Sequence, residues 1–305
     1  MNLPDPATVN RVACVGAGTI GAGWAALFLS QGLAVTASDP AEGAEDRLRA
    51  LVARAWPSLK RLGLAAGADP SRLMFDADLG TALDGAQFVQ ESAPDHQDLK
   101  VALIEQIERN LPDDVVIASS SSTFLPSVLA RQSRVPARVI VGHPFTPSYL
   151  MPLVEVVGGD ATPGAVLDWA MAFYRRVGKR PLRLRREIER YISNRLQSVV
   201  RREIDSLVEA GICDYHQADE ALVYGPGMRW AFMGPMLGMH FTGGEGGIRG
   251  NIAHFGWSGP AALKEMAVAA VDEMTGGRDA DTLERWRDEN LIALLKALKP
   301  LDTGT

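Results

Sequence analysis

An apolar run that breaks into three regularly spaced glycines constrains the fold of this chain more than any other feature. Residues 12–15 (Val-Ala-Cys-Val) lead into a Gly-x-Gly-x-x-Gly motif at residues 16–21. Apolar residues at 24–29 follow with a helical pattern, and a second apolar run at residues 33–38 ends on Asp39. A strand, a glycine turn, a helix, a second strand and an acidic residue about 20 residues after the glycines form the fingerprint of a dinucleotide-binding unit.

Each position of this motif has a physical role in holding NAD. We expect Gly16 to form the tight turn, Gly18 to let the pyrophosphate approach the backbone, and Gly21 to let helix and strand pack closely. The start of the helix offers unpaired N–H groups and a partial positive charge to the phosphates. Asp39 would accept hydrogen bonds from the adenosine ribose and repel a 2′-phosphate, which predicts NAD rather than NADP. The predicted cofactor-binding residues of this motif are Gly16, Gly18, Thr19, Ile20, Gly21 and Asp39.

Length, charge and cysteine content exclude several classes of protein. The 305 residues are enough for two domains, and the net charge of -6 argues against nucleic acid or an anionic membrane surface as a partner. Cys14 and Cys213 are the only cysteines and neither belongs to a metal-ligand spacing, so we expect no metal site, no disulfide and a reducing compartment. The first residues lack the pattern of a secretory signal and no apolar stretch is long enough to span a bilayer, which together predict a cytoplasmic protein.

The pattern of the chain changes near residue 187. Before it, apolar strands alternate with helical segments, as in a doubly wound α/β sheet, whereas residues 187–298 contain only helical segments separated by glycine-rich turns. We therefore predict an α/β protein in which an N-terminal Rossmann-type doubly wound sheet, the NAD-binding domain (residues 1–186), precedes an all-helical C-terminal domain (residues 187–305) for substrate binding and dimerisation. Beyond the glycine motif, strands are expected at 73–75, 86–91, 115–118, 139–141, 153–157 and 181–184, and helices at 41–62, 98–110 and 163–177.

Two separated residues are candidates for acid–base chemistry. His143 follows the predicted strand 139–141, and the carboxyl ends of strands are where ligands bind in doubly wound sheets. Glu155 lies inside the apolar strand 153–157, where a buried carboxylate needs a partner. A pair of His143 and Glu155 would meet that need and would fix the imidazole tautomer, which leaves the other ring nitrogen free as a general base.

Two further polar segments have ordinary structural explanations. The run at residues 119–123 (Ser-Ser-Ser-Ser-Thr) follows the fifth predicted strand, and such runs are commonly loops or helix caps. Asn194 stands early in a long predicted helix, where an exposed position would account for it.

Several motifs in one order carry a resemblance to a known family. They are the glycine motif, residues 90–94 (Gln-Glu-Ser-Ala-Pro) leading to Leu99-Lys100, residues 119–123, His143-Pro144-Phe145 running on to residues 152–157, residues 178–181 and residues 194–197. Over nearly its full length the chain resembles the L-3-hydroxyacyl-CoA dehydrogenase superfamily. Residues 228–231 with Gly234-Pro235, residues 243–247 and residues 287–291 are similar to the branch that contains L-gulonate 3-dehydrogenase (lambda-crystallin) and L-carnitine dehydrogenase.

The resemblance implies roles for individual residues. His143 matches the family's general base and Glu155 the carboxylate that orients it. Ser122 matches the serine at the substrate hydroxyl, and Asn194 the asparagine that contacts the substrate oxygen. Positions that contact the cofactor in the family match Asp39, Asp95 and Lys100.

The chain departs from the family pattern at three places. Asp95 stands where many members have Glu, and Thr146 stands where Asn commonly follows His-Pro-Phe. Glu189-Arg190-Tyr191 replaces a usual Gly-Phe, which puts bulk and charge near the expected substrate pocket.

The resemblance implies NAD-dependent oxidation of the 3-hydroxyl of a small L-3-hydroxy acid, with L-carnitine as the first candidate and L-gulonate as the second. The alternative is an L-3-hydroxyacyl-CoA dehydrogenase of the 3-hydroxybutyryl-CoA type, and a remote alternative is a non-catalytic NAD-binding or structural protein. Phe145 and Trp230 are candidate aromatic contacts for a trimethylammonium group. Arg190 or Arg229 is a candidate contact for a carboxylate, and Arg190 would oppose a cation.

The helical domain is also expected to form a homodimer. Residues 221–224 and 228–241 carry more apolar surface than one small helical layer can bury, notably at Met233, Met236, Leu237 and Met239. A large apolar patch marks an interface, and closed two-fold dimers are the commonest assembly. The alternative is that these methionines fill an internal core.

Overall fold

The computed structural model describes residues 3–298. The chain separates into two compact units, which divide between Ser198 and Val199. Helix α7 (Tyr191–Glu209) crosses this division. The sequence analysis places the domain boundary at residues 186/187, just before that helix begins.

The first unit is built on one eight-stranded sheet with the strand order β3-β2-β1-β4-β5-β6-β7-β8. The strands are β1 (Arg11–Val15), β2 (Ala34–Ser38), β3 (Leu73–Phe75), β4 (Phe88–Glu91), β5 (Val116–Ser119), β6 (Val139–Pro144), β7 (Leu153–Gly158) and β8 (Arg180–Arg183). All neighbouring strands run parallel except β6 and β7, which are antiparallel. The strand order reverses between β1 and β4, and this switch point is where doubly wound sheets open a crevice for ligands.

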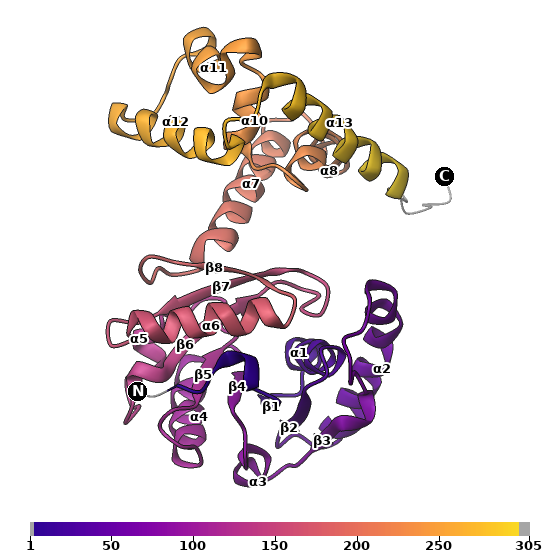
Figure 1. Cartoon of the computed structure of the whole chain (residues 1–305), viewed down its shortest axis with the longest axis vertical. Helices are drawn as coiled ribbons and strands as arrows, with labels where there is room; N and C mark the ends of the chain where they lie inside the picture. The colour runs from indigo at the N-terminus through magenta and orange to yellow at the C-terminus, as the bar shows by residue number, and fades with distance from the viewer. Residues whose placement is uncertain (1–2, 299–305) are drawn as a thin grey trace. The chain divides into compact units, whose positions relative to one another are not determined.

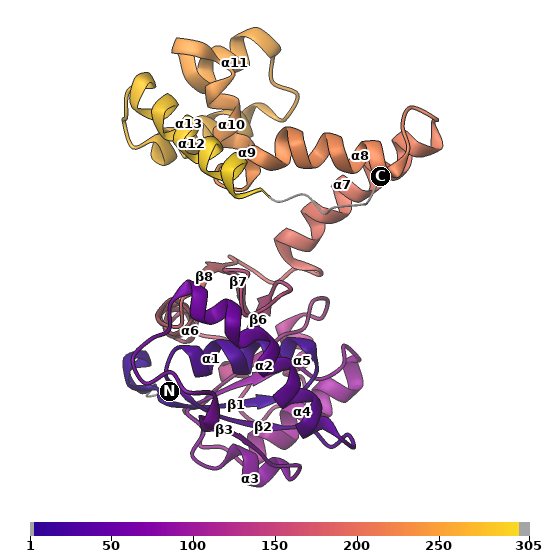
Figure 2. The same ribbon diagram turned by 90° about the vertical axis from the view of Figure 1, so that its right-hand side faces the viewer.

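Helices cover both faces of the sheet (Figures 1 and 2). They are α1 (Thr19–Ser30), α2 (Ala44–Leu62), α3 (Leu79–Leu83), α4 (Gln97–Arg109), α5 (Pro126–Leu129) and α6 (Gly164–Arg176), with 3₁₀ turns at Pro6–Thr8, Pro70–Arg72 and Pro136–Arg138. Alternate residues of β1 belong to two different cores: Val12 and Cys14 pack with α1, α2 and α6, whereas Ala13 and Val15 pack with α3, α4 and α5. Since successive strand residues point to opposite faces, this alternation identifies a sheet buried on both sides.

The second unit contains helices and no strand among its described residues. Its elements are the rest of α7, α8 (Tyr215–Leu222), a π-helical segment (Val223–Gly227), α9 (Met228–Trp230), α10 (Pro235–Phe241), a 3₁₀ turn (Gly244–Gly246), α11 (Gly247–Phe255), α12 (Ala261–Thr275) and α13 (Ala280–Ala297). The prediction of a Rossmann-type sheet followed by helices is therefore confirmed. No described helix has the length and apolar character needed to cross a membrane.

The methionines expected on an exposed face of the helical unit lie largely inside it. Met233 is buried, while Met236 and Leu237 pack against the cluster of Ile248, Ile252, Val268 and Val271. Met236 and Leu237 turn inward because α10 packs on both α11 and α12. Internal core packing, the alternative, is therefore correct for Met233, Met236 and Leu237, whereas Val223, Tyr224 and Trp230 of the same segments are exposed.

Candidate active site

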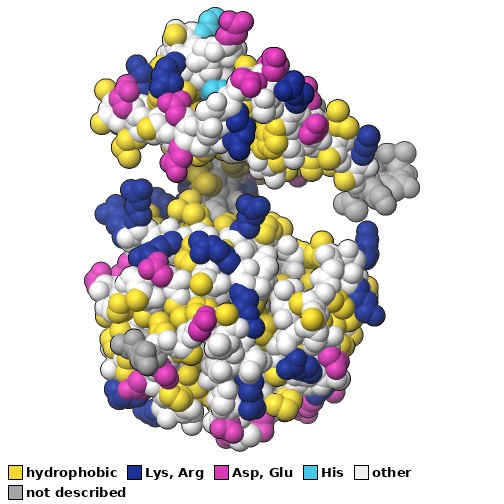
Figure 3. All heavy atoms as spheres, in the orientation of Figure 1, with side chains coloured by type: hydrophobic (Ala, Val, Ile, Leu, Met, Phe, Trp, Pro, Cys, Tyr) yellow, Lys and Arg dark blue, Asp and Glu magenta, His cyan; other side chains and the backbone are white. Residues whose placement is uncertain are grey.

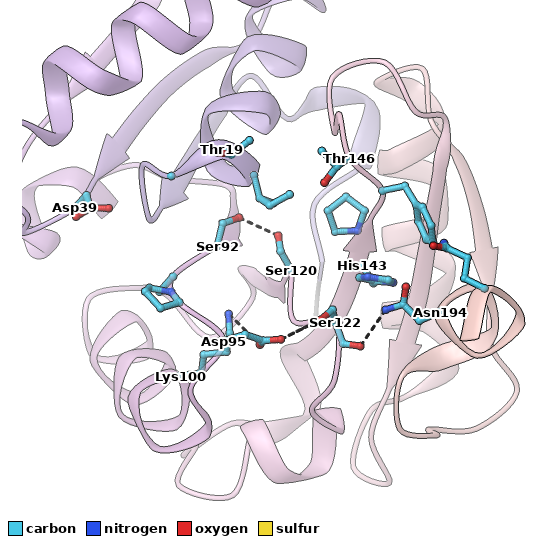
Figure 4. Close-up of a pocket in the computed structure, with 17 residues that line it drawn as sticks. Thr19, Asp39, Ser92, Asp95, Lys100, Ser120, Ser122, His143, Thr146 and Asn194 are labelled. Carbon is cyan, nitrogen blue, oxygen red and sulfur yellow. Dashed lines mark hydrogen bonds and ion pairs between the residues drawn. The ribbon is translucent and has the colours of Figure 1, made fainter. Parts of the chain in front are cut away.

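A pocket of about 740 Å³ opens at the carboxyl ends of the central strands of the first unit. It is lined by Gly18, Thr19, Ile20, Asp39, Ser92, Ala93, Pro94, Asp95, Lys100, Ser120, Ser122, His143, Pro144, Phe145, Thr146, Asn194 and Gln197. Figure 4 shows Asp39 at one end of this pocket and His143 with Asn194 at the other. Sequence segments that are far apart in the chain thus contribute to one site.

The glycine turn fits a dinucleotide. A Cβ atom at Gly16 would lie 2.6 Å from the carbonyl carbon of Ser92, and one at Gly21 would lie 1.9 Å from the carbonyl oxygen of Gly16. Around Gly18, by contrast, nothing lies within 4 Å of an added Cβ. Gly18 also precedes α1 without a capping side chain, so the first N–H groups of the helix remain available to a phosphate.

Asp39 is held at the end of β2 by two backbone groups. One carboxylate oxygen accepts from the N–H of Ala17 at 2.8 Å, and the other accepts from the N–H of Ala41 at 2.9 Å. The carboxylate is thereby fixed beside the glycine turn and lines the pocket. This is the position that the sequence analysis expects for contact with the adenosine ribose.

His143 and Glu155 form a hydrogen-bonded pair, although His143 does not follow its strand as predicted. Strand β6 continues to Pro144, so His143 lies inside it and directly opposite Glu155 in the antiparallel β7. Residues opposite one another across antiparallel strands present side chains on the same face, and here His143 Nδ1 lies 2.9 Å from Glu155 Oε2. Within residues 3–298, Nε2 of His143 makes no hydrogen bond to protein, and the ring borders the pocket.

Glu155 is fully buried and also binds the first turn of α7. Its Oε1 accepts from the N–H groups of Ile192 and Ser193, each at 3.0 Å, and its Oε2 accepts from the Ser193 hydroxyl at 2.6 Å. Burial opposes ionisation of Glu155, but the hydrogen bonds from His143 and Ser193 outweigh it, and the pKa of Glu155 is lower than its ordinary value. Glu155 is therefore a carboxylate at neutral pH and keeps His143 protonated at Nδ1.

Two of the unusual residues at the start of α7, Arg190 and Tyr191, occupy different environments. Tyr191 is buried, its hydroxyl donates to the Phe124 carbonyl, and its ring centroid lies 5.3 Å from that of His143. Burial raises the pKa of Tyr191, so the phenol stays protonated. Arg190 is exposed, donates to the Ser198 hydroxyl at 2.9 Å and does not line the pocket. Both residues have positive φ values, +61° and +51°, a conformation that costs free energy in side chains other than glycine.

The serine loop after β5 is anchored by Asp95. The Ser121 hydroxyl donates to one oxygen of Asp95 at 2.8 Å, and the Ser122 hydroxyl donates to the other at 3.0 Å. Asn194 Nδ2 lies 3.4 Å from the Ser122 carbonyl oxygen, so Ser122 and Asn194 meet at the His143 end of the pocket (Figure 4). The two predicted substrate-contacting residues are therefore neighbours, although 72 positions separate them in the chain.

Lys100 makes a contact that the sequence analysis missed. Its ammonium lies 2.8 Å from the buried carboxylate of Glu91 at the end of β4, and 4.0 Å from Asp95. A carboxylate at the end of an apolar strand was the available signal, because a buried carboxylate needs a cation or several donors. Phe145 and Thr146 line the pocket, whereas Trp230 is exposed on α9 of the second unit. Among residues 3–298, no three His, Cys, Asp or Glu side chains form a group suited to a metal.

The mostly parallel sheet, the glycine turn and the acidic residue after β2 define the class of NAD-binding Rossmann proteins, and comparison with known proteins identifies the family within this class. Residues 11–188 match the family model of the 3-hydroxyacyl-CoA dehydrogenase NAD-binding domain, and residues 191–279 match that of its C-terminal domain. The chain belongs to the 3-hydroxyacyl-CoA dehydrogenase family. It is an NAD-dependent oxidoreductase that acts on CH–OH groups, as the sequence analysis expects.

Individual relatives agree with this membership. L-carnitine dehydrogenase of Nocardiopsis dassonvillei is 45% identical over 97% of this chain and 94% of its own length. The solved (S)-3-hydroxybutyryl-CoA dehydrogenase of Ralstonia eutropha is 26% identical, with a TM-score of 0.65 over 86% of this chain and 94% of that chain. A solved 5-formyl-3-hydroxy-2-methylpyridine 4-carboxylic acid 5-dehydrogenase has a TM-score of 0.76 over 95% of this chain and 98% of that chain, and its 24% identity indicates a shared fold.

Proposed function

We propose that this protein oxidises the 3-hydroxyl of a small L-3-hydroxy acid, and that L-carnitine is its substrate. The observation that carries the proposal is the paired His143 and Glu155 at a pocket of the NAD-binding unit, in a chain 45% identical to an L-carnitine dehydrogenase. Bound NAD⁺ supplies the acceptor for the hydride that leaves C3. The contacts to NAD are assigned to Gly16, Gly18, Thr19, Ile20, Gly21, Asp39, Asp95 and Lys100.

The chain's own residues hold the hydroxyl and take its proton. His143 receives the proton at Nε2, because Nδ1 is occupied by its hydrogen bond to Glu155. The carboxylate of Glu155 stabilises the imidazolium that results. Ser122 and Asn194 lie at the same end of the pocket and position the substrate oxygen as it becomes a carbonyl, Asn194 through its amide and Ser122 by turning to this oxygen the hydroxyl proton that it otherwise donates to Asp95.

The lining of the pocket is compatible with a substrate that has a cationic end. Among the described residues, the cation that lines the pocket is Lys100, whose ammonium is paired with Glu91, so no free positive charge opposes such a substrate. A trimethylammonium group is attracted to the face of Phe145, which lines the pocket. Asn194 and Gln197 offer neutral amide donors to a carboxylate.

The lining of the pocket disfavours the rival substrates. Its described residues offer no free cation to the phosphates of an acyl-CoA, and Arg190, a candidate clamp, donates to Ser198 and does not line the pocket. L-Gulonate has a carboxylate, as L-carnitine does, but it has no cationic group for the face of Phe145. A non-catalytic NAD-binding protein has no need for a buried base oriented by a carboxylate. L-Gulonate and 3-hydroxybutyryl-CoA remain the comparison substrates.

The test is the initial rate of NADH formation with L-carnitine, L-gulonate and L-3-hydroxybutyryl-CoA, each over a full concentration range. The proposal expects saturable turnover with L-carnitine and a kcat/KM at least about tenfold lower for the other two. Turnover with the thioester and none with the two free acids would overturn it. D-carnitine is the matched control, because it has the same charges and differs only in the configuration at C3.

We also propose that residues 187–305 form the substrate and dimerisation domain. Only seven hydrophobic residues are buried between residues 199 and 298: Ala218, Met233, Ile248, Ile252, Val268, Val271 and Leu283. Large apolar side chains on α12 and α13 are exposed, among them Met266 and Leu295, and Figure 3 shows apolar side chains among charged ones over these helices. A second copy of the chain would cover this apolar surface.

A further inference from the structure

A chain of hydrogen bonds runs beneath the pocket from α6 to the loop after β4. The Tyr174 hydroxyl lies 2.7 Å from Gln90 Oε1, and Gln90 Nε2 lies 2.9 Å from Ser120 Oγ. Trp24 Nε1 approaches the same Ser120 oxygen at 3.2 Å, and Ser92 Oγ lies 2.8 Å from it. Ser92 and Ser120 both line the pocket, and Figure 4 draws the contact between them.

The orientation of the Gln90 amide is fixed by its surroundings. Gln90 Nε2 lies 3.3 Å from the carbonyl oxygen of Gly142, which only accepts hydrogen bonds. A reversed amide would place two acceptor oxygens against each other at this point. Gln90 therefore donates to Ser120 and accepts from Tyr174.

This orientation determines the direction of the hydrogen bond between the two serines. A hydroxyl oxygen has two lone pairs, and those of Ser120 receive the Trp24 indole N–H and the Gln90 amide N–H, neither of which can accept. Ser120 therefore cannot also accept from Ser92 and must donate its own proton to Ser92 Oγ. Although Ser120 lines the pocket, its hydrogen-bonding capacity is fully used.

We propose that Ser92 is a hydrogen-bond donor to bound NAD, with its proton directed into the pocket by Ser120. Ser92 Oγ accepts from Ser120, and within residues 3–298 no protein group accepts its proton. The half-buried hydroxyl is thus left with a free proton at the edge of the cofactor site.

The position of Ser92 indicates which part of NAD it meets. Its backbone lies against Gly16, and its Cβ lies 3.5 Å from the position of a Cβ at Gly21, so it adjoins the glycine turn. In Figure 4 it lies between Asp39 and His143, away from both ends of the pocket. We therefore assign its acceptor to an oxygen of the pyrophosphate or of the ribose that carries the nicotinamide.

Binding measurements on the intact protein test the proposal without a substrate. The dissociation constants of NADH, ADP-ribose and adenosine are measured for the wild type and for Ser92→Ala, with Ser71→Ala as the control. Ser71 is an exposed serine in the 3₁₀ turn Pro70–Arg72. Its hydroxyl donates to Asp69, and it does not line the pocket. We expect Ser92→Ala to weaken NADH and ADP-ribose by roughly tenfold each and to leave adenosine within about twofold, because adenosine lacks both assigned acceptors.

Three results would overturn the proposal. They are an NADH affinity in Ser92→Ala within twofold of the wild type, an equal loss in Ser71→Ala, and an ADP-ribose affinity that does not fall. If Ser92→Ala also lowers the melting temperature of the cofactor-free protein, its loss of NADH affinity is a structural effect, and this outcome too counts against the proposal. These results concern the affinity for the cofactor and its fragments, so they do not depend on which hydroxy acid the enzyme oxidises.

A second variant tests the role of Ser120. Ser120→Ala leaves the Ser92 hydroxyl in place but removes its fixed direction, so we expect NADH to weaken by about two- to threefold. The double variant should bind NADH as Ser92→Ala does, because Ser120 acts only through Ser92. Multiplied losses in the double variant would contradict this arrangement.

Discussion

Replacing Glu155 with glutamine changes one atom in the proposed catalytic pair, and the structure predicts how the new amide must orient. Oε1 of Glu155 accepts two backbone N–H groups, from Ile192 and Ser193, and backbone donors cannot reverse. The single amide oxygen of Glu155→Gln must therefore stay with them. The NH₂ group then faces His143 Nδ1, where the carboxylate oxygen was.

The consequence is the wrong tautomer of His143. An NH₂ group donates to Nδ1, so the imidazole proton moves to Nε2, and the nitrogen that faces the pocket can no longer accept a proton. General-base catalysis contributes about 10²–10⁴ in rate, or roughly 3–5 kcal/mol of transition-state stabilisation. We expect kcat of Glu155→Gln to fall by this factor, while the dissociation constant of NADH stays within about twofold of the wild type.

Stopped-flow measurement of NADH formation gives the rate, and ¹⁵N NMR of labelled histidine, assigned with His143→Gln, gives the tautomer. Ser193→Ala is the matched control, because it removes a donor to Oε2 and leaves the carboxylate in place. We expect it to lose less than about tenfold in kcat and to keep the proton on Nδ1. A Glu155→Gln variant that retains more than a tenth of wild-type kcat, while His143→Gln is inactive, would refute the reasoning.

Three further predictions concern the cofactor, the pH dependence of stability and the assembly. Asp39→Ala should lose most of the preference for NAD over NADP, measured as the ratio of the two kcat/KM values, because the charge that repels a 2′-phosphate is gone; an unchanged ratio would exclude this role. Burial lowers the pKa of Lys179 from 10.5 to about 8, so between these pH values the unfolded chain binds a proton that the folded protein has released. The free energy of unfolding should therefore rise from pH 8 to pH 10 by up to about 3 kcal/mol more in the wild type than in Lys179→Met, measured by urea denaturation, and equal slopes would contradict this. Sedimentation velocity at micromolar concentration should show a dimer that dissociates in the double variant Met266→Glu/Leu295→Glu, and a monomeric wild type would overturn the proposed interface.

The local sequence pattern was sufficient to predict the sheet and the glycine turn. Residues 12–39 predict β1, α1 and β2 because each step depends on short-range signals: an apolar run, glycines and a terminal acid. The partner of His143 was also predictable, since Glu155 in an apolar strand needs a buried partner. The end of β6 was misplaced, because its last residues, His143 and Pro144, are held by pairing with β7, a contact that no local pattern reveals.

Long-range contacts limited the prediction of the site. Ser193 stands beside Asn194 in the sequence, and nothing local distinguishes it as the donor to Glu155 across 38 positions. Likewise, the direction of the bond between Ser92 and Ser120 depends on Trp24 and on the orientation of Gln90. Such networks arise from packing between elements, and the sequence alone shows only the residue types available.

Transfer of deuterium from C3 tests the account's central claim most directly, because it reports the substrate, the reacting bond and the cofactor together. The measurement is mass spectrometry of the NADH formed from L-carnitine that carries deuterium at C3. We predict one deuterium in each NADH molecule, and at least about a hundredfold slower formation in His143→Gln. Absence of NADH, or NADH without deuterium, would contradict the assignment of this protein as an L-3-hydroxy acid dehydrogenase that uses L-carnitine.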